Sequence, residues 1–337
     1  DTTLRVRLVR GLGTNWVSET HRLLADSVGS SGSPPLRRES DLGLKEANGG
    51  ATPELGIAST SQVRVPRTIR VLLADGSTVH YLDLETYVRR VLPREWIASW
   101  GRFTGGRNAL MAGAVAVRTY AVGFVNHPQA NTYDICGTAA CQTYGTTTYS
   151  ETDEAVAATQ YLLMVRPGDG TIPRYLTEYS AEQNAKGLAC GDGYAGNAGS
   201  CIVDPVCAGE TRNGHGRGMC QWGSAKWATG LKFPGNSMAN TTTTTGQPRQ
   251  DWQWILAHYY PELVQVQAAP LQVGDVVQVI WGPLNVRQCA DGGIANGVNC
   301  PSVGSKPLGS TGVIVDGPVW VSSDGRGHTW WKVQWSD

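Results

Sequence analysis

The stretch from Asn108 to Phe124 constrains the fold more than any other part of the sequence, because alanine and glycine occur on every side of the helix that it would form. Its small residues are Ala109, Ala112, Gly113, Ala114, Ala116 and Ala121. Small side chains let neighbouring backbone approach closely, so the segment is predicted to be a central, buried helix. Arg118 interrupts the apolar run and no other stretch approaches the length of a membrane span, so no transmembrane segment is expected.

The region before this helix shows strand signals followed by a helix signal. Apolar and β-branched runs at 63–65 and 69–73 predict strands, and Asp75-Gly76 predicts a hairpin turn after the second run. Asp83 can cap a following helix, in which apolar residues recur at helical spacing. Pro93 is expected to end that helix and to open the next segment.

The region after the central helix mixes both kinds of element. A helix is predicted from Ser150, and a strand pair is predicted from 161–165 and 172–180, which flank a Pro-Gly-Asp-Gly turn. A short helix is predicted at 254–260. The fold class that follows is α+β.

Composition suggests three parts and an exported protein. A boundary is expected at Ala268-Ala-Pro270, which gives a segment 1–62 packed on or part of the main domain, a main domain 63–267 and a small all-β barrel at 271–337. Equal numbers of basic and acidic residues, 28 of each, give no electrostatic footprint for nucleic acid. Eight cysteines favour an oxidising compartment, and thus a secreted or cell-surface location.

Five separated motifs occur in a fixed order along the chain: 87–96 (YVRRVLPREW), 112–121 (AGAVAVRTYA), 141–145 (CQTYG), 214–223 (GHGRGMCQWG) and 255–260 (ILAHYY). Together they resemble the SpoIID/LytB family of bacterial cell-wall enzymes. The resemblance implies a SpoIID-like domain whose central helix and antiparallel strands surround a substrate cleft. It also implies a lytic transglycosylase that cleaves peptidoglycan glycan strands between MurNAc and GlcNAc and leaves anhydromuramyl ends.

Within that resemblance the catalytic residue falls on Glu95, which follows Pro93-Arg94 in the first motif. Glycosidic cleavage needs a protonated acid, and the apolar neighbours Trp96 and Trp100 could raise the pKa of a carboxyl group. The same carboxylate would then accept a proton from the muramic C6 hydroxyl. The alternative for Glu95 is a solvated carboxylate in a first helical turn.

The other motifs supply candidate substrate contacts, for each of which a structural role is the alternative. They are Arg118, Gln142, Tyr144, Tyr179, Ser180, His215, Arg217, Met219 and Gln221. For His215 the alternative is an exposed histidine in a glycine-rich turn. For Arg118 it is a buried ion pair.

The cysteines raise the question of zinc, which some members of the resembled family bind. Cys136 and Cys141 lie where that metal would be, but a tetrahedral site needs two further ligands, and His127 is the only imidazole nearby. A Cys136–Cys141 disulfide and no cofactor are therefore expected, with zinc as the alternative. The remaining disulfide candidates are Cys190, Cys201, Cys207, Cys220, Cys289 and Cys300, and the sequence does not give the connectivity of the first four.

Two departures from the family pattern keep other functions open. Cys220 replaces a common serine and is expected to be disulfide-bonded, and 181–187 replaces a Ser/Gly-rich segment. A non-catalytic peptidoglycan-binding protein or an activator of a cell-wall amidase is one alternative. A structural surface or matrix protein is another.

The last fifth of the chain carries a resemblance of its own. The segments 282–287 and 331–333 resemble the opening and closing strands of bacterial SH3-like domains, which bind cell wall. We therefore expect 271–337 to form a separable module that binds peptidoglycan, with Cys289 and Cys300 joined.

Overall fold

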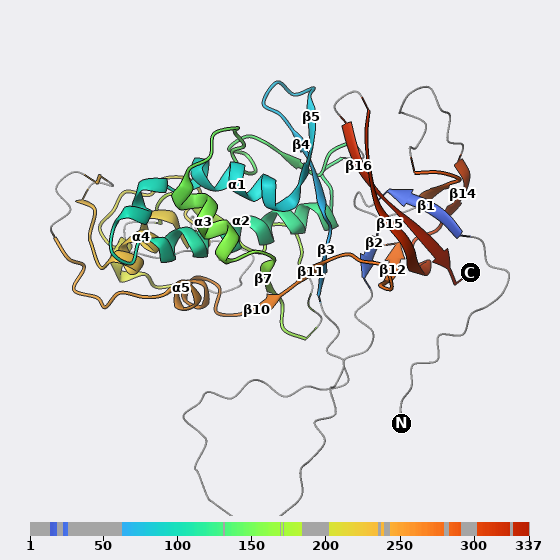
Figure 1. Ribbon diagram of the computed structural model, residues 1–337. Coiled ribbons are helices and arrows are strands. Elements are labelled where there is room, and N and C mark those ends of the chain that lie inside the picture. Colours follow the sequence, from blue (N-terminus) through green and yellow to red (C-terminus); the bar gives the residue numbers. More distant parts are fainter. Residues whose placement is uncertain are drawn as a thin grey trace, which may run out of the picture.

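The computed structural model describes residues 14–18, 23–25, 63–130, 132–168, 170, 172–183, 202–234, 237–238, 243–279, 283–290, 302–323 and 326–336. It confirms the α+β class. Figure 1 shows a helical part built around α2 beside a twisted sheet that contains the last strands of the chain. The elements are β1 Thr14–Ser18, β2 Leu23–Ala25, β3 Arg64–Val65, β4 Thr68–Leu72, β5 Val79–Asp83, α1 Leu84–Glu95, η2 Ala98–Arg102, α2 Arg107–Asn126, β6 Ile135–Cys136, α3 Ser150–Ala158, β7 Leu162–Val165, β8 Tyr179–Ser180, η3 Pro205–Cys207, β9 Met219–Cys220, α4 Gln221–Thr229, α5 Trp252–Tyr259, β10 Val264–Gln267, β11 Ala269–Pro270, β12 Val276–Val279, β13 Leu284–Arg287, β14 Ser302–Lys306, β15 Thr311–Ser323 and β16 Arg326–Trp335.

Helix α2 is the centre of the helical part, as its small residues predicted. It packs against α1, α3, α4 and α5. At Gly123 an added Cβ would lie 2.5 Å from the carbonyl oxygen of Pro173, so only glycine allows this approach. By length and composition α2 could cross a membrane, but 89% of its apolar window is buried inside the protein. It is the only such helix among the described residues.

The elements that lead into α1 follow the sequence signals. Strands β4 and β5 form the predicted antiparallel hairpin. The Asp83 side chain caps α1 by accepting a hydrogen bond of 3.0 Å from the Thr86 N–H. The prediction that Pro93 ends the helix is wrong, because α1 continues to Glu95. Proline in the last turn removes only one N–H bond, and the Trp96 N–H closes the end by donating to the Leu92 oxygen at 2.7 Å.

The predicted strand pair from 161–165 and 172–180 is wrong. Strand β7 pairs antiparallel with β10, a hundred residues further along the chain. Most of 172–178 forms turns, in which Tyr175 has a positive φ of 64°, and only β8 is extended. Strand β8 pairs in parallel with β9, which brings Tyr179 beside Met219.

The sheet of the second part contains strands from both ends of the sequence. Its order is β14-β13-β1-β16-β15-β12-β2, and β1 pairs with β16 along its whole length. The described strands form an open sheet and do not close into the expected barrel. Residues 14–18 and 23–25 therefore belong to the same sheet as the C-terminal strands (Figure 1).

The two parts are joined by more than the connecting chain. Strand β11, at the expected boundary, pairs in parallel with β3. Arg64 and Asp275 form an ion pair of 2.8 Å, with both side chains largely buried. The Arg67 guanidinium lies over the Trp331 ring at 5.9 Å. These contacts attach the sheet to the helical part that carries the candidate site.

Candidate functional site

Glu95 is the last residue of α1 and lines a cavity of about 300 Å³ that is open to solvent. The cavity is lined by Pro93, Arg94, Glu95, Trp96, Ile97, Ala98, Ser99, Arg102 and Tyr149. Trp96 lines the cavity and Trp100 belongs to the same hydrophobic core, and each residue is 1% exposed. The expected apolar wall next to Glu95 is therefore present.

Two donors from distant segments hold the Glu95 carboxyl group. The Thr143 N–H donates to Oε1 at 2.6 Å. The Gln221 Nε2 donates to Oε2 at 3.3 Å and to the Glu95 backbone oxygen at 2.7 Å. Burial raises the pKa of Glu95 above its ordinary value, although both hydrogen bonds act in the opposite direction. The result is a positioned carboxyl group that retains its proton to higher pH than a solvated glutamate.

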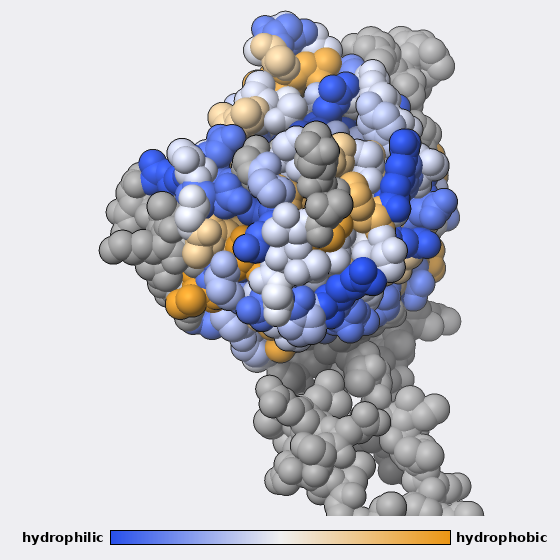
Figure 2. All heavy atoms as spheres, turned by 90° about the vertical axis from the view of Figure 1, so that its left-hand side faces the viewer, coloured by the Kyte–Doolittle hydropathy of each residue, from blue (hydrophilic) through white to orange (hydrophobic). Residues whose placement is uncertain are grey.

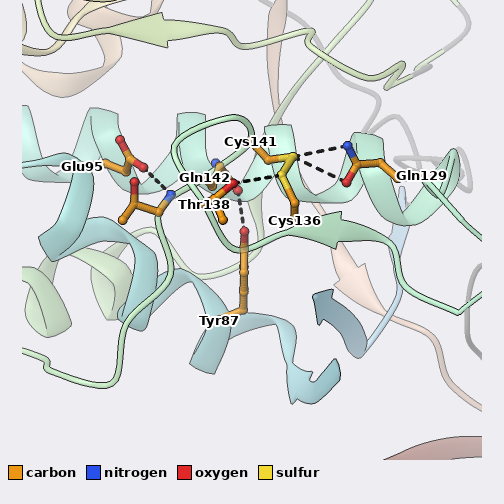
Figure 3. The surroundings of a disulfide bond; sticks show 8 residues. Tyr87, Glu95, Gln129, Cys136, Thr138, Cys141 and Gln142 are labelled. Atoms are coloured by element: carbon orange, nitrogen blue, oxygen red, sulfur yellow. Dashed lines mark hydrogen bonds between the residues drawn. A yellow bond between two sulfur atoms is a disulfide. The ribbon is translucent and has the colours of Figure 1, made fainter. Parts of the chain in front are cut away.

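A disulfide fixes the loop that brings Thr143 to Glu95. Cys136 and Cys141 are joined by an S–S bond of 2.04 Å, as expected. Figure 3 shows this loop, with Gln142 immediately after it, lying beside Glu95. A disulfide offers no thiolate for a metal ion, so in this form the pair does not fit a zinc site.

Gln142 lies underneath the site and not on its surface. Its side chain accepts a bond of 2.9 Å from the Tyr87 hydroxyl and donates to the Tyr179 hydroxyl at 3.0 Å. It has no exposed surface, so the prediction that it contacts substrate is corrected to a role in positioning these two tyrosines. Tyr179 in turn packs edge-on against Trp96, with ring centroids 4.8 Å apart.

Tyr144 is partly exposed and contacts residues of α1. Its hydroxyl accepts a bond of 2.7 Å from Arg90 Nη1. Its ring stacks on Tyr87 with centroids 6.1 Å apart. Both contacts orient the loop that carries Thr143.

Arg118 forms the buried ion pair that was its alternative. Its guanidinium donates two hydrogen bonds to Glu85, of 2.7 and 2.8 Å, and has no exposed surface. A glycan cannot reach it, so its assignment as a substrate contact is corrected. The pair joins α2 to the first turn of α1, the helix that ends at Glu95.

The fourth motif divides into a buried and a surface part. Met219 has no exposed surface, and Ser180, which pairs with Cys220 across the β8–β9 pair, has 5%, so the prediction that these two residues contact substrate is corrected. Arg217 pairs with Glu178 at 2.8 Å, and its backbone N–H donates to His215 Nδ1 at 3.0 Å. Burial lowers the pKa of His215, which favours the neutral imidazole. The residue of this motif that hydrogen-bonds to Glu95 is Gln221.

The sequence interpretation missed Thr143 and Tyr149. Thr143 acts through its backbone N–H, so its side-chain type carries no signal. Tyr149 lines the cavity with 48% of its surface exposed, so its ring is accessible to a ligand there. Its position shortly after the third motif was the available signal. Arg102, on the same cavity wall, pairs with Glu151 at 2.7 Å.

A second group of side chains that could bind a ligand lies at the N-terminus of α4. Glu182, Cys207 and Cys220 place their ligand atoms within 4.8 Å of one another, the only such metal-compatible group among the described residues. Cys220, expected to be disulfide-bonded, is a thiol here, as is Cys207. Cys289 is disulfide-bonded. Cys190, Cys201 and Cys300 lie outside the described residues.

The end of the helical part that carries α4 and α5 is mostly polar at its surface. Figure 2 shows hydrophobic residues on this face in small separate patches among hydrophilic ones. Trp254 of α5 is one exposed hydrophobic residue, with 36% of its surface accessible.

Part of the chain is similar to a known protein family. Residues 74–165 match the model of the SpoIID family, described as stage II sporulation protein. The match runs from the hairpin through β7 and contains Glu95, the disulfide loop and Arg118. No curated protein matches the chain. The match supports the resemblance for this region, and the SpoIID family is linked to degradation of peptidoglycan.

Proposed function

We propose that the chain is a secreted cell-wall enzyme that cleaves peptidoglycan glycan strands between MurNAc and GlcNAc by a lytic transglycosylase reaction. The observation that carries the proposal is the Glu95 carboxyl group, which has a raised pKa, two fixed donors and access to an open cavity. The first requirement of glycosidic cleavage is an acid that keeps its proton near neutral pH.

Glu95 then serves as acid and base in turn. Its proton passes to the glycosidic oxygen as the bond from that oxygen to the muramic C1 breaks. The carboxylate accepts the proton of the muramic C6 hydroxyl, whose oxygen bonds to C1 and closes the anhydro ring. Glu95 thereby regains its proton, and no water is consumed. Thr143 N–H and Gln221 Nε2 stabilise the carboxylate between the two steps.

Among the described residues that line the cavity, Glu95 is the only acidic one, which favours this route. Ordinary glycosidases use two carboxyl groups, one of which activates water or acts as nucleophile. A single carboxyl group suits a reaction in which the substrate supplies its own nucleophile. No cofactor is required, so the activity should survive chelation.

Tyr149 and the arginines beside it are the proposed substrate contacts at the cavity. An exposed tyrosine ring can stack on a sugar face, and Arg94 and Arg102 can donate to hydroxyl, acetamido or carboxylate oxygens. His215 and Arg217 are proposed to extend the binding surface along the strand. The seven-stranded sheet is proposed to be the SH3-like unit that retains the protein on the wall.

Product analysis tests the proposal. Purified glycan strands, with and without stem peptides, are incubated with the full chain, and the products are examined by mass spectrometry. Anhydromuramyl ends support the proposal, whereas new reducing ends with added water would show hydrolysis. Binding without any cleavage would favour the alternative of a peptidoglycan-binding protein or amidase activator, which is then tested by adding a cell-wall amidase.

A further inference from the structure

The thiols of Cys207 and Cys220 lie unusually close together in the interior. Both residues have no exposed surface, and their sulfur atoms are 2.9 Å apart. Cys207 ends η3, and Cys220 ends β9 and caps α4, where its sulfur accepts a hydrogen bond from the Gly223 N–H at 3.1 Å. The two sulfurs therefore lie where the end of η3 meets the start of α4.

A metal ion fits this pair poorly. Two thiolates on one tetrahedral zinc, with Zn–S bonds of about 2.3 Å, would lie about 3.8 Å apart. The third group, Glu182, already pairs with Lys226 Nζ at 3.3 Å, and the same ammonium pairs with Glu210 at 3.0 Å. A buried positive charge beside the site opposes a second cation. The sulfurs at 2.9 Å are closer than two such thiolates would be, and a disulfide would bring them to about 2.05 Å.

We propose that Cys207 and Cys220 join in a disulfide, and that this bond holds Gln221 against the Glu95 carboxyl group. In the reaction two S–H bonds break and one S–S bond forms. The two electrons and two protons pass to the disulfide of a thiol–disulfide oxidoreductase, or of a small molecule such as oxidised glutathione, which becomes two thiols. Burial raises the pKa of both thiols, so exchange takes place before the chain closes over them.

The surroundings make Cys207 a rigid anchor. Asp204, at the start of the same turn, accepts hydrogen bonds from Trp227 Nε1 at 2.9 Å and from the Tyr259 hydroxyl at 2.5 Å. These bonds fix η3 to α4 and α5. A bond from this anchor to Cys220 would limit the movement of the next residue, Gln221, whose amide contacts Glu95.

The other donor to Glu95 is held in the same way. Thr143 follows Cys141 by two residues, and Cys141 is bonded to Cys136. With the proposed bond, each donor to the carboxyl group lies one or two residues after a disulfide-bonded cysteine. The positioning part of this inference rests on the proposed function, whereas the existence of the bond does not.

Disulfide mapping tests the bond without any assay of activity. The full chain, produced by export into an oxidising compartment, is denatured and alkylated without reduction, digested and examined by mass spectrometry. A linked pair of peptides that contains Cys207 and Cys220 is expected. Alkylation of both residues, or a link from either one to Cys190 or Cys201, would overturn the proposal.

A titration of Glu95 tests the positioning. The carboxyl carbon of Glu95 is followed by NMR against pH in the wild-type chain, in Cys207→Ala/Cys220→Ser and in Gln221→Ala, and the signal is assigned by its loss in Glu95→Gln. Serine at 220 can still cap α4. Because the Gln221 bond lowers the pKa of Glu95, both variants should titrate at higher pH than wild type. If only Gln221→Ala is shifted, the bond does not position Gln221.

A kinetic comparison completes the design. If the proposed activity is found, the double cysteine variant should lose roughly tenfold or more in kcat. The basic limb of its pH profile should move in the same direction as the titration. If the wild type cleaves nothing, the proposed function fails, while the mapping and titration still decide this inference.

Discussion

The indole ring of Trp96 packs directly on Gly113 of α2, where an added Cβ would lie 2.7 Å from the ring. Trp96 is adjacent to Glu95, and its Nε1 donates to Ser224 Oγ at 3.1 Å. The central helix thus determines the position of Trp96, which forms the apolar wall of the site. The small residues of α2 serve the site as well as the core.

Gly113→Ala should therefore displace Trp96. Overpacking of a closed core costs about 1–3 kcal/mol, and the thermal midpoint should fall accordingly. Movement of Trp96 should also lower the rate of glycan cleavage. Thermal unfolding and product release by mass spectrometry measure the two effects.

Ala116→Gly is the matched control in the same buried helix. It weakens the helix by about 1 kcal/mol without placing an atom against Trp96. Cleavage by this variant at a temperature where it is folded should be close to wild type. An equal loss of activity in the two variants would show that stability, and not the position of Trp96, is responsible.

Glu95→Gln should abolish glycan cleavage and leave folding and strand binding intact. The amide keeps the shape of the side chain but has no proton to transfer to the leaving oxygen. Glu154→Gln, at an exposed glutamate of α3 with 63% of its side chain accessible, is the control. Anhydromuramyl ends released by Glu95→Gln at near the wild-type rate would remove Glu95 from its role as the acid.

The raised pKa of Glu95 also predicts a pH-dependent cost in stability. In the unfolded chain Glu95 ionises near its ordinary pKa of 4.5, whereas in the folded chain it ionises at a higher pH. As pH rises from there to the raised pKa, the free energy of unfolding that Glu95 contributes should fall. The thermal midpoint of Glu95→Gln relative to wild type should therefore increase between about pH 4 and about pH 7. A constant difference across this range would contradict a raised pKa.

The sequence predicted well where the signal is local. The Asp83 cap and the burial of α2 follow from neighbouring residues, and both are present. Pro93 was judged by a rule for helix interiors, whereas it lies in the last turn, where a single lost hydrogen bond is tolerated.

The interpretation failed where partners are distant in sequence. The pairing of β1 with β16 joins segments about three hundred residues apart, and no periodicity marks it. The burial of Gln142 and Arg118 depends on helices that pack over them. A sequence motif can therefore identify these residues but does not show whether their side chains are buried or accessible to substrate. Thr143 contributes a backbone N–H, which every residue except proline has.

Tyr149→Ala should weaken substrate binding more than chemistry. Loss of the exposed ring removes a stacking surface at the cavity, so KM should rise several-fold while kcat changes little. Tyr149→Phe keeps the ring and should behave like wild type. Steady-state kinetics on defined glycan fragments separates the two constants, and an unchanged KM in the alanine variant would exclude Tyr149 as a contact.

Strand β1 should be required for the sheet that is proposed to bind the wall. It lies between β13 and β16, and Val17 pairs with Trp331 of β16. Proline in such a central strand removes a ladder hydrogen bond, so Val17→Pro should loosen the sheet. The expected result is weaker sedimentation of the full chain with insoluble peptidoglycan. Cleavage of soluble glycan fragments should be retained, since α1, α2 and the cavity have a separate core.

Val303→Pro in β14 provides the comparison for this variant, because β14 is at the edge of the described sheet and Val303 is exposed. Proline is tolerated better at an edge than in a central strand, so wall binding should be nearly unchanged.

The pairing of β1 also revises the expectation that 271–337 is a separable module. Expressed alone, this fragment should not fold stably, because it lacks β1 and leaves β13 and β16 without their shared partner. Adding 14–25 to the fragment should restore folding, as judged by cooperative thermal unfolding. Full wall binding by Val17→Pro, or by the fragment without β1, would show that the N-terminal strand is dispensable for the sheet.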